Sequence, residues 1–271
     1  MKELFRGVWV VGYREILRLT GQRSRLVASI LTPLLFFALF GAGFNQLVGQ
    51  IFPGVDLMTF MFPGIVAMTV IMPSVFTGMS VVWDREFGFL REILVSPLSR
   101  TGIALGKVGG GALVATVEGL ILLALAPLVG VSLSLLQILE LTVLLLILAG
   151  TLAGFGILVG VRIRSQETFQ TVMALVVFPL IFLSGIFFPV DSTPGWMALV
   201  AKLNPVTYGV DAVRQVVLRN TIRPDSPLPG GHPELGVTVF GQNLGVGAEA
   251  LVVLLSGVVL VALASRAFGE E

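Results

Sequence analysis

Six long stretches of this chain contain almost no charged residue. A helix needs about 20 apolar residues to cross the hydrocarbon core of a bilayer. Composition agrees, because 55% of the 271 residues are hydrophobic and only 12% are charged. We therefore predict an all-α integral membrane protein with six transmembrane helices, in one transmembrane domain over residues 1–271. The stretches, in which only Glu118 and Glu249 carry charge, are Leu26–Val55, Leu57–Trp83, Val108–Leu139, Leu141–Val161, Thr168–Val190 and Val246–Ser265.

The positions of Lys and Arg predict the orientation of these spans. With the N-terminus inside, every Lys and Arg except Lys202, Arg214, Arg219 and Arg223 falls in a cytoplasmic segment. Both termini are then cytoplasmic. Residues 1–25 combine an apolar face with basic residues, which predicts an amphipathic helix in the membrane interface. This helix either only anchors the chain or also cradles a cytoplasmic partner.

Residues 84–100, "DREFGFLREILVSPLSR", form the predicted cytoplasmic loop between spans two and three. Phe87, Leu90 and Leu94 recur at helical spacing among charges of both signs, and Pro97 disfavours helical geometry at Ser96. The pattern predicts a short amphipathic helix, which is either a docking surface or a helix lying flat on the membrane. Its residues are Asp84, Arg85, Glu86, Phe87, Gly88, Phe89, Leu90, Arg91, Glu92, Ile93 and Leu94.

The segment 191–245 is the predicted extracellular part of the chain. Asp191 or Ser192 can cap a helix through "TPGWMALVAKL", and Asn204 with Pro205 can begin a second helix. Both helices are too short to cross a membrane. Beyond Asn220 the chain is rich in Pro and Gly and is predicted to be a flexible excursion, in which the lone His232 has no metal-ligand cluster around it.

Two of these segments resemble a known family. "LREILVSPLSR" after the second span and "SGIFFPVDSTPGWMALVAKLNPVTYGVDAVR" after the fifth are similar to the membrane subunit of type-2 ATP-binding-cassette (ABC) transporters, which include daunorubicin-resistance and nodulation-factor export permeases. The resemblance covers the whole chain in order. It implies that residues 84–94 are a coupling helix seated in an ATPase subunit. It also implies a re-entrant helix pair between helices 5 and 6 that closes the outer end of the pathway, with Trp196, Asn204, Pro205, Tyr208, Asp211 and Arg214 in this gate.

The partners follow from the same resemblance. It implies two copies of an ABC ATPase and a second permease, as a homodimer or a heterodimer, in the plasma (inner) membrane of a prokaryote. "GIALGKV" at Gly102–Val108 has too few residues between its glycines for a phosphate-binding loop and lacks Ser or Thr after Lys107. We therefore expect a transport subunit that is not itself an enzyme. It binds no metal, cofactor or nucleic acid, and ATP and magnesium lie on the partner ATPase.

Glu118 is the one acidic residue deep within a predicted span. An ionisable group there indicates a substrate or proton pathway, or a hydrogen bond between packed helices. Together with Pro residues in spans two and five, it supports an alternative function, an ion-coupled secondary transporter with inverted three-helix repeats. The exporter remains the main prediction, because the alternative gives the charged inner loop no role. The abundance of Phe, Leu and Val favours a hydrophobic or lipid-like substrate, such as a drug, a lipid or a lipid-linked glycan.

Overall fold

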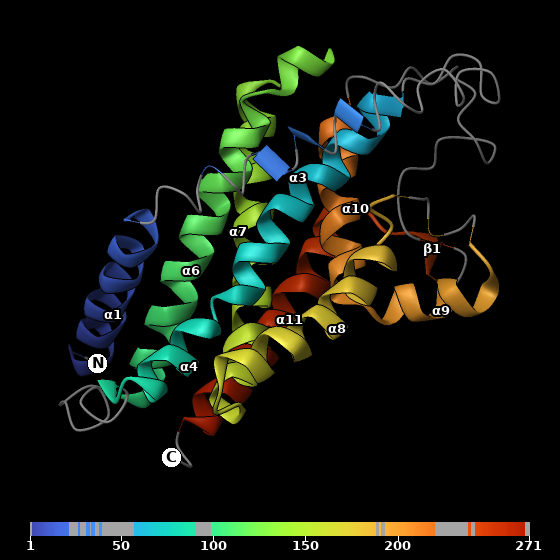
Figure 1. The fold of residues 1–271 in the computed structure, drawn as a ribbon. Helices are drawn as coiled ribbons and strands as arrows, with labels where there is room; N and C mark the ends of the chain where they lie inside the picture. Colours follow the sequence, from blue (N-terminus) through green and yellow to red (C-terminus); the bar gives the residue numbers. More distant parts are fainter. Residues whose placement is uncertain are drawn as a thin grey trace.

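The computed structural model describes residues 2–21, 57–89, 99–187, 193–219 and 242–268, with a few positions between these ranges. Two short strands, β1 (Thr238–Val239) and β2 (Gln242–Asn243), form an antiparallel pair. The predicted first span, Leu26–Val55, lies almost wholly outside the described residues, as does most of the excursion beyond Asn220. The helices in Figure 1 are α1 (Lys2–Thr20), α3 (Leu57–Phe76), α4 (Met79–Glu86), α6 (Arg100–Leu123), the 3-10 helix η1 (Ala126–Val129), α7 (Leu135–Arg162), α8 (Gln166–Phe182), α9 (Gly195–Leu203), α10 (Pro205–Leu218) and α11 (Val246–Ala267).

Four helical segments in the described part are long and apolar enough to cross a membrane. They match four of the predicted spans, and α8, with 17 residues, is a shorter apolar helix at the position of a fifth. The prediction of a helical, multi-pass membrane protein is thereby confirmed, whereas six spans remain a prediction. The four segments are Met61–Glu86, Arg100–Leu123, Leu135–Arg162 and Val246–Ala267.

Contacts between helix ends give the relative directions of the spans. Arg100 at the start of α6 donates a hydrogen bond to the Phe268 carbonyl just beyond α11, at 2.7 Å. At the opposite end, Gln137 near the start of α7 donates to the Val216 carbonyl near the end of α10, at 2.8 Å. The start of α1 and the end of α11 lie at the same end of the bundle (Figure 1). We call this the inner end, since the sequence predicts it to be cytoplasmic.

Glycines allow α7 to touch the preceding span backbone to backbone. A Cβ added at Gly78, in the break between α3 and α4, would lie 1.9 Å from the Gly156 carbonyl oxygen. One added at Gly156 would lie 2.0 Å from the Val75 carbonyl oxygen, and one at Gly160 would lie 2.4 Å from that of Gly78. Helices in lipid associate through such close packing rather than through the hydrophobic effect. Gly154 of the same helix packs instead against Val261 of α11, whereas Gly150 has open space around it.

The start of α6 differs from the sequence-based prediction, which began this span at Val108. The Ser99 hydroxyl accepts a hydrogen bond from the Gly102 amide at 3.1 Å and caps a helix that begins at Arg100. Lys107 is therefore inside the helix instead of in the preceding loop. Small residues bring this part of α6 close to α1, because Gly106 and Gly110 lie against Val11, Gly12 and Glu15 of α1.

The connections on the other side of the bundle follow their sequence signals in all but one case. Gly130, with a positive φ of 76°, and the Ser134–Gln137 capping box form the turn between η1 and α7. Asn204 caps α10 and Pro205 is its first residue, as predicted. The predicted cap of the preceding helix is wrong. α9 begins at Gly195, after Pro194, with no side-chain cap, because Pro194 fixes the chain before the first helical turn.

Candidate coupling site at the inner end of the bundle

The residues Phe87, Gly88 and Phe89 form an exposed apolar turn at the inner end, which we call the docking turn. Phe87 is 69% exposed and Phe89 is 52% exposed. Gly88 has a φ of 80°, a left-handed conformation that ends α4 and that other residues adopt with strain. The remaining predicted coupling residues, Leu90–Leu94, lie outside the described residues. The turn therefore presents two aromatic side chains at the point where the predicted coupling helix begins.

The three residues before the docking turn belong to the preceding span. The sequence predicts a separate helix from Asp84, but Asp84, Arg85 and Glu86 are the last turn of α4. Helical geometry continues through them because the chain meets its first break only at Gly88. This is a correction to the predicted helix boundary. It matters for the site because each of the three side chains contacts a different part of the bundle.

Asp84 is only 2% exposed and lies in a cluster of ionised side chains. Its Oδ2 accepts a hydrogen bond from Lys107 Nζ of α6 at 2.6 Å, and its Oδ1 pairs with Arg14 of α1 at 2.5 Å. Lys107, which is fully buried, also pairs with Glu15 of α1 at 2.9 Å and contacts the Ser80 hydroxyl at 3.0 Å. We call Arg14, Glu15, Asp84 and Lys107 the ion cluster. It joins α1, α4 and α6.

The charges of the ion cluster balance, with two cationic and two anionic side chains. Balance is needed because an unpaired buried charge costs several kcal/mol. Sequence reasoning predicted neither the burial of Lys107 nor the involvement of Arg14 and Glu15. The signal that could have found Lys107 is Ser99. If Ser99 is interpreted as a helix cap, Lys107 lies two turns inside α6, beside the glycines at which α1 packs closely.

Arg85 and Glu86 contact the corner between α7 and α8. Arg85 donates to the Val161 and Ile163 carbonyls, both at 2.6 Å, at the end of α7. Glu86 accepts a hydrogen bond from the Gln166 backbone amide at 3.3 Å, at the start of α8, and another from the Gln166 side-chain amide. A cation at a helix C-terminus and an anion at an N-terminus both favour the helix dipole. The end of α4 therefore supplies caps to two helices at once.

α1 has one face on the protein and one face outward. Gly7 and Gly12 pack against the Gly102 and Gly106 backbone of α6. The outward face carries large apolar side chains, all more than half exposed: Phe5, Trp9, Tyr13 and Leu17. The predicted amphipathic helix is therefore present, and it runs beside the inner half of α6 (Figure 1). Its position relative to the membrane stays a prediction.

The predicted gate residues lie around the corner between α9 and α10. Asn204 donates to the Leu180 carbonyl of α8 at 2.9 Å, and Tyr208 donates to the Lys202 carbonyl at 2.7 Å. Arg214, which is buried, donates to the Gly185 carbonyl at 2.6 Å and lies 3.6 Å from Asp211. Trp196 stands apart, on an outward face of α9 at 67% exposure. The other five predicted gate residues lie on α10 or at its cap, and the structure pairs Asp211 with Arg214.

Glu249, near the start of α11, lies within reach of the same corner. Gln215 of α10 donates to Glu249 at 2.9 Å and also to the Leu244 carbonyl at 3.0 Å. Because α10 is too short to be a candidate span, Tyr208 of this helix lies outside the candidate membrane-spanning segments. Burial raises the pKa of Tyr208, and the Glu249 carboxylate raises it further. Tyr208 is therefore a neutral hydrogen-bond donor near pH 7.

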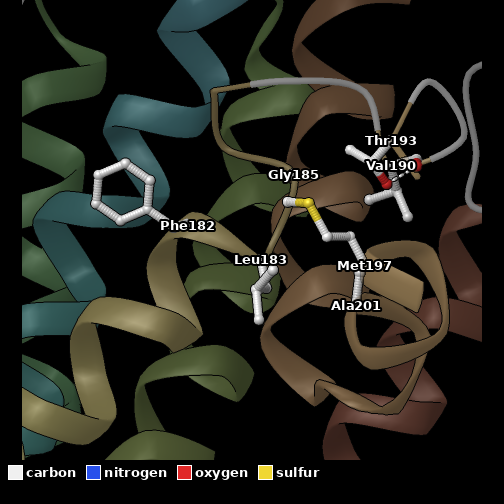
Figure 2. A pocket seen from close by; sticks show the side chains of 7 residues that line it. All are labelled: Phe182, Leu183, Gly185, Val190, Thr193, Met197 and Ala201. Atoms are coloured by element: carbon white, nitrogen blue, oxygen red, sulfur yellow. Dashed lines mark hydrogen bonds between the residues drawn. The ribbon is translucent and has the colours of Figure 1, made fainter. Parts of the chain in front are cut away.

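A small apolar pocket lies where α8 ends and α9 passes it. Figure 2 shows Met197 reaching from α9 toward Gly185, with Val190 and Thr193 on the far side. Gly185 has a φ of 77°, which lets the chain turn sharply after α8. The pocket marks a loosely filled space beside the predicted gate. Its lining residues are Phe182, Leu183, Gly185, Val190, Thr193, Met197 and Ala201.

Glu118 lies deeper in the bundle than the ion cluster. It is 1% exposed within α6, eleven residues beyond Lys107, which is about 16 Å along a helix. The neighbouring Gly119 packs against Val70 of α3 and Leu145 of α7. Glu118 is therefore buried within the bundle, as predicted for an ionisable residue in a span.

A comparison with known protein families identifies the class of protein to which this chain belongs. The model of the family described as "ABC-2 type transporter" matches residues 6–218. The chain belongs to this family. It is therefore a transmembrane transport subunit of an ABC transporter, a class that works with an ATPase partner.

Named relatives agree with this family. The ycf38 transport permease of Cyanophora paradoxa is 28% identical over 79% of this chain and 73% of its own length. "Nodulation protein J" of Rhizobium leguminosarum bv. trifolii is 27% identical over 73% of this chain and 76% of its own. "Probable multidrug ABC transporter permease YbhR" of Escherichia coli K12 is 32% identical over 54% of this chain, but the match spans only 40% of that relative.

Proposed function

We propose that this chain is the membrane subunit of an ATP-driven exporter that moves a hydrophobic or lipid-like molecule out of the cytoplasm or inner leaflet. Two copies of the chain, or one copy and a related permease, enclose the pathway, and two separate ATPase subunits bind at the inner end. The plasma membrane of a prokaryote is the proposed location. Family membership supports the class of transporter, and relatives named for multidrug transport and nodulation support export.

The observation that carries this proposal is the docking turn. Phe87 and Phe89 are exposed at the inner end, while Asp84, directly before them, is held by buried ion pairs. Exposed aromatic side chains on a segment that is fixed by buried ion pairs are the arrangement expected at the centre of a protein–protein interface. Family resemblance extends the anchor through Leu94. The ATPase contact therefore consists of the residues from Phe87 onward, whereas Asp84, Arg85 and Glu86 connect it to the bundle.

At the opposite end we propose that α9 and α10 close the pathway. Their corner is tied to α8 by Asn204 and to the chain after α8 by Arg214. A movement of α8 therefore acts directly on both short helices. Glu118 can contribute a hydrogen bond to the moving bundle. The alternative of an ion-coupled secondary transporter has the burial of Glu118 in its favour, but family membership favours ATP-driven transport.

Purification from native membranes tests the proposal. A tagged chain extracted in mild detergent should bring down an ATPase subunit, and the complex should hydrolyse ATP in lipid nanodiscs. Compounds that stimulate hydrolysis would identify the substrate class. Recovery of a transporter that is active without any ATPase would contradict the proposal.

A further inference from the structure

The end of α4 contacts two separate groups of helices through neighbouring side chains. Asp84 points to α1 and α6, where it meets Arg14 and Lys107. Arg85 and Glu86 point to the corner between α7 and α8. The docking turn follows immediately at Phe87. Any displacement of this turn must therefore act on both groups through three consecutive residues.

We propose that Asp84–Glu86 is a junction that divides the movement of the docking turn between two arms. The α1 arm runs through Asp84 to Arg14 and Lys107. The α8 arm runs through Arg85 and Glu86 to the corner between α7 and α8. This inference rests on the proposed function, because it needs an ATPase that moves the docking turn.

The contacts of the α1 arm are suited to transmit force. Lys107 is fully buried and holds one carboxylate from α4 and one from α1, so α1 and α4 share a single cation. Separating α1 from α4 would take Lys107 away from the carboxylate of Glu15 or of Asp84, and a buried charge without its partner is costly in a low-dielectric interior. The contacts of Gly7 with Gly102 and of Gly12 with Gly106 join the backbones of α1 and α6 directly, without an intervening side chain that could absorb a displacement. The end of α4, α1 and the start of α6 therefore move together.

The α8 arm uses a different chemistry. Arg85 bonds two carbonyls that the end of α7 leaves without helical partners, and Glu86 bonds the first amide of α8. Ile163 and Ser165, which border the corner, have extended backbone conformations. The corner is thus a short non-helical link that Arg85 bonds on the α7 side and Glu86 bonds on the α8 side. Since α8 leads to the corner of α9 and α10 through Asn204, this arm connects the docking turn to the predicted gate.

Dye labelling can follow each arm separately. The chain contains no cysteine, so a single introduced thiol takes one bimane dye. One labelled chain carries Val10→Cys on α1 and another carries Leu175→Cys on α8, both at exposed positions. Each labelled chain is assembled with its ATPase in lipid nanodiscs. The emission is recorded without nucleotide and after vanadate has trapped ADP on the ATPase.

We expect both dyes to respond to trapping in the otherwise unchanged chain. Asp84→Asn should abolish most of the response at position 10 and keep the response at position 175. Arg85→Gln should abolish most of the response at position 175 and keep the response at position 10. Asp84→Asn leaves Lys107 paired with Glu15, so it leaves no buried cation unpaired. Arg162→Gln, the same chemical change at an exposed residue of the same corner, should leave both responses intact.

Two further variants cover the case in which a primary variant fails to fold. Arg14→Gln tests the α1 arm at a side chain that is 43% exposed, and Glu86→Gln tests the α8 arm at an exposed residue. The junction is overturned if the variants keep both responses, or if each variant loses both responses while the ATPase stays bound. Failure of the unchanged chain to bind an ATPase would instead overturn the proposed function.

Discussion

At the scale of single residues, Lys107 shows how far a buried charge can organise a helical membrane protein. It is fully buried and holds two carboxylates from two other helices. Sequence reasoning assigned it to a cytoplasmic loop, because positive charge near a span is ordinarily read that way. The partners could not be predicted from the sequence, since Glu15, Asp84 and Lys107 are far apart along the chain and each resembles an ordinary interfacial residue.

Replacement of Lys107 should therefore be costly. Lys107→Met leaves Glu15 buried without its cation and leaves Asp84 paired with Arg14 alone, and we expect it to lower the free energy of unfolding by about 3–5 kcal/mol. SDS titration in mixed micelles measures this change. Adding Glu15→Gln to Lys107→Met should recover part of the loss, because Arg14 still pairs with Asp84. Equal stability of the single variant and the unchanged chain would contradict the ion cluster.

A second residue-scale prediction concerns the contact between α7 and the span before it. Gly156→Ala places a methyl group 2.0 Å from the Val75 carbonyl oxygen, so the helices must separate. Overpacking of this kind costs about 1–3 kcal/mol. Gly150→Ala is the matched control on the same helix, because its Cβ meets only open space. Thermal unfolding should show a loss for Gly156→Ala alone, and the same loss for both variants would contradict the predicted close contact.

At the scale of elements, the start of α10 was predictable from local signals, because Asn204 followed by Pro205 is a recognisable helix start. Ser134 with Gln137 begins α7 by a similarly local capping box, which the sequence analysis did not predict. The boundaries that were missed involve tertiary contacts. α4 continues through Asp84–Glu86 to the break at Gly88, with these three side chains bonded to other helices, and α9 starts late because Pro194 precedes it. Hydropathy alone could not reveal the contact between α1 and α6, since an amphipathic helix suits either a membrane or a protein surface.

The corner between α9 and α10 offers a test at this scale. Asn204→Ala removes both the cap of α10 and the hydrogen bond to the Leu180 carbonyl. Loss of such a cap costs about 1 kcal/mol, and the lost bond to α8 adds to it. We expect faster proteolysis between α9 and α10 in the folded chain. Leu203→Ala, at a neighbouring residue that is 77% exposed, is the control, and equal cleavage of both variants would contradict the structural role of Asn204.

At the scale of the whole molecule, one continuous helical framework connects the docking turn with the predicted gate. α7 is in contact with α3, α6, α10 and α11, and the α4 end and α8 meet at its inner terminus. The helical, multi-pass membrane fold and the positions of four of the six predicted spans were predictable from hydropathy. The way in which Asp84–Glu86 connects the helices was not, because it depends on which side chains the folded bundle brings together.

The affinity of the ATPase subunit for the chain in lipid nanodiscs tests the central claim most directly. Phe87→Ala removes an exposed anchor at the inner end, and Phe178→Ala removes a similarly exposed ring from α8, at 69% and 61% exposure. An aromatic anchor at an interface centre contributes about 2 kcal/mol or more. We predict that Phe87→Ala weakens ATPase binding at least tenfold and that Phe178→Ala leaves it unchanged. Unaltered binding by Phe87→Ala, in a chain that folds normally, would contradict the assignment of the docking turn.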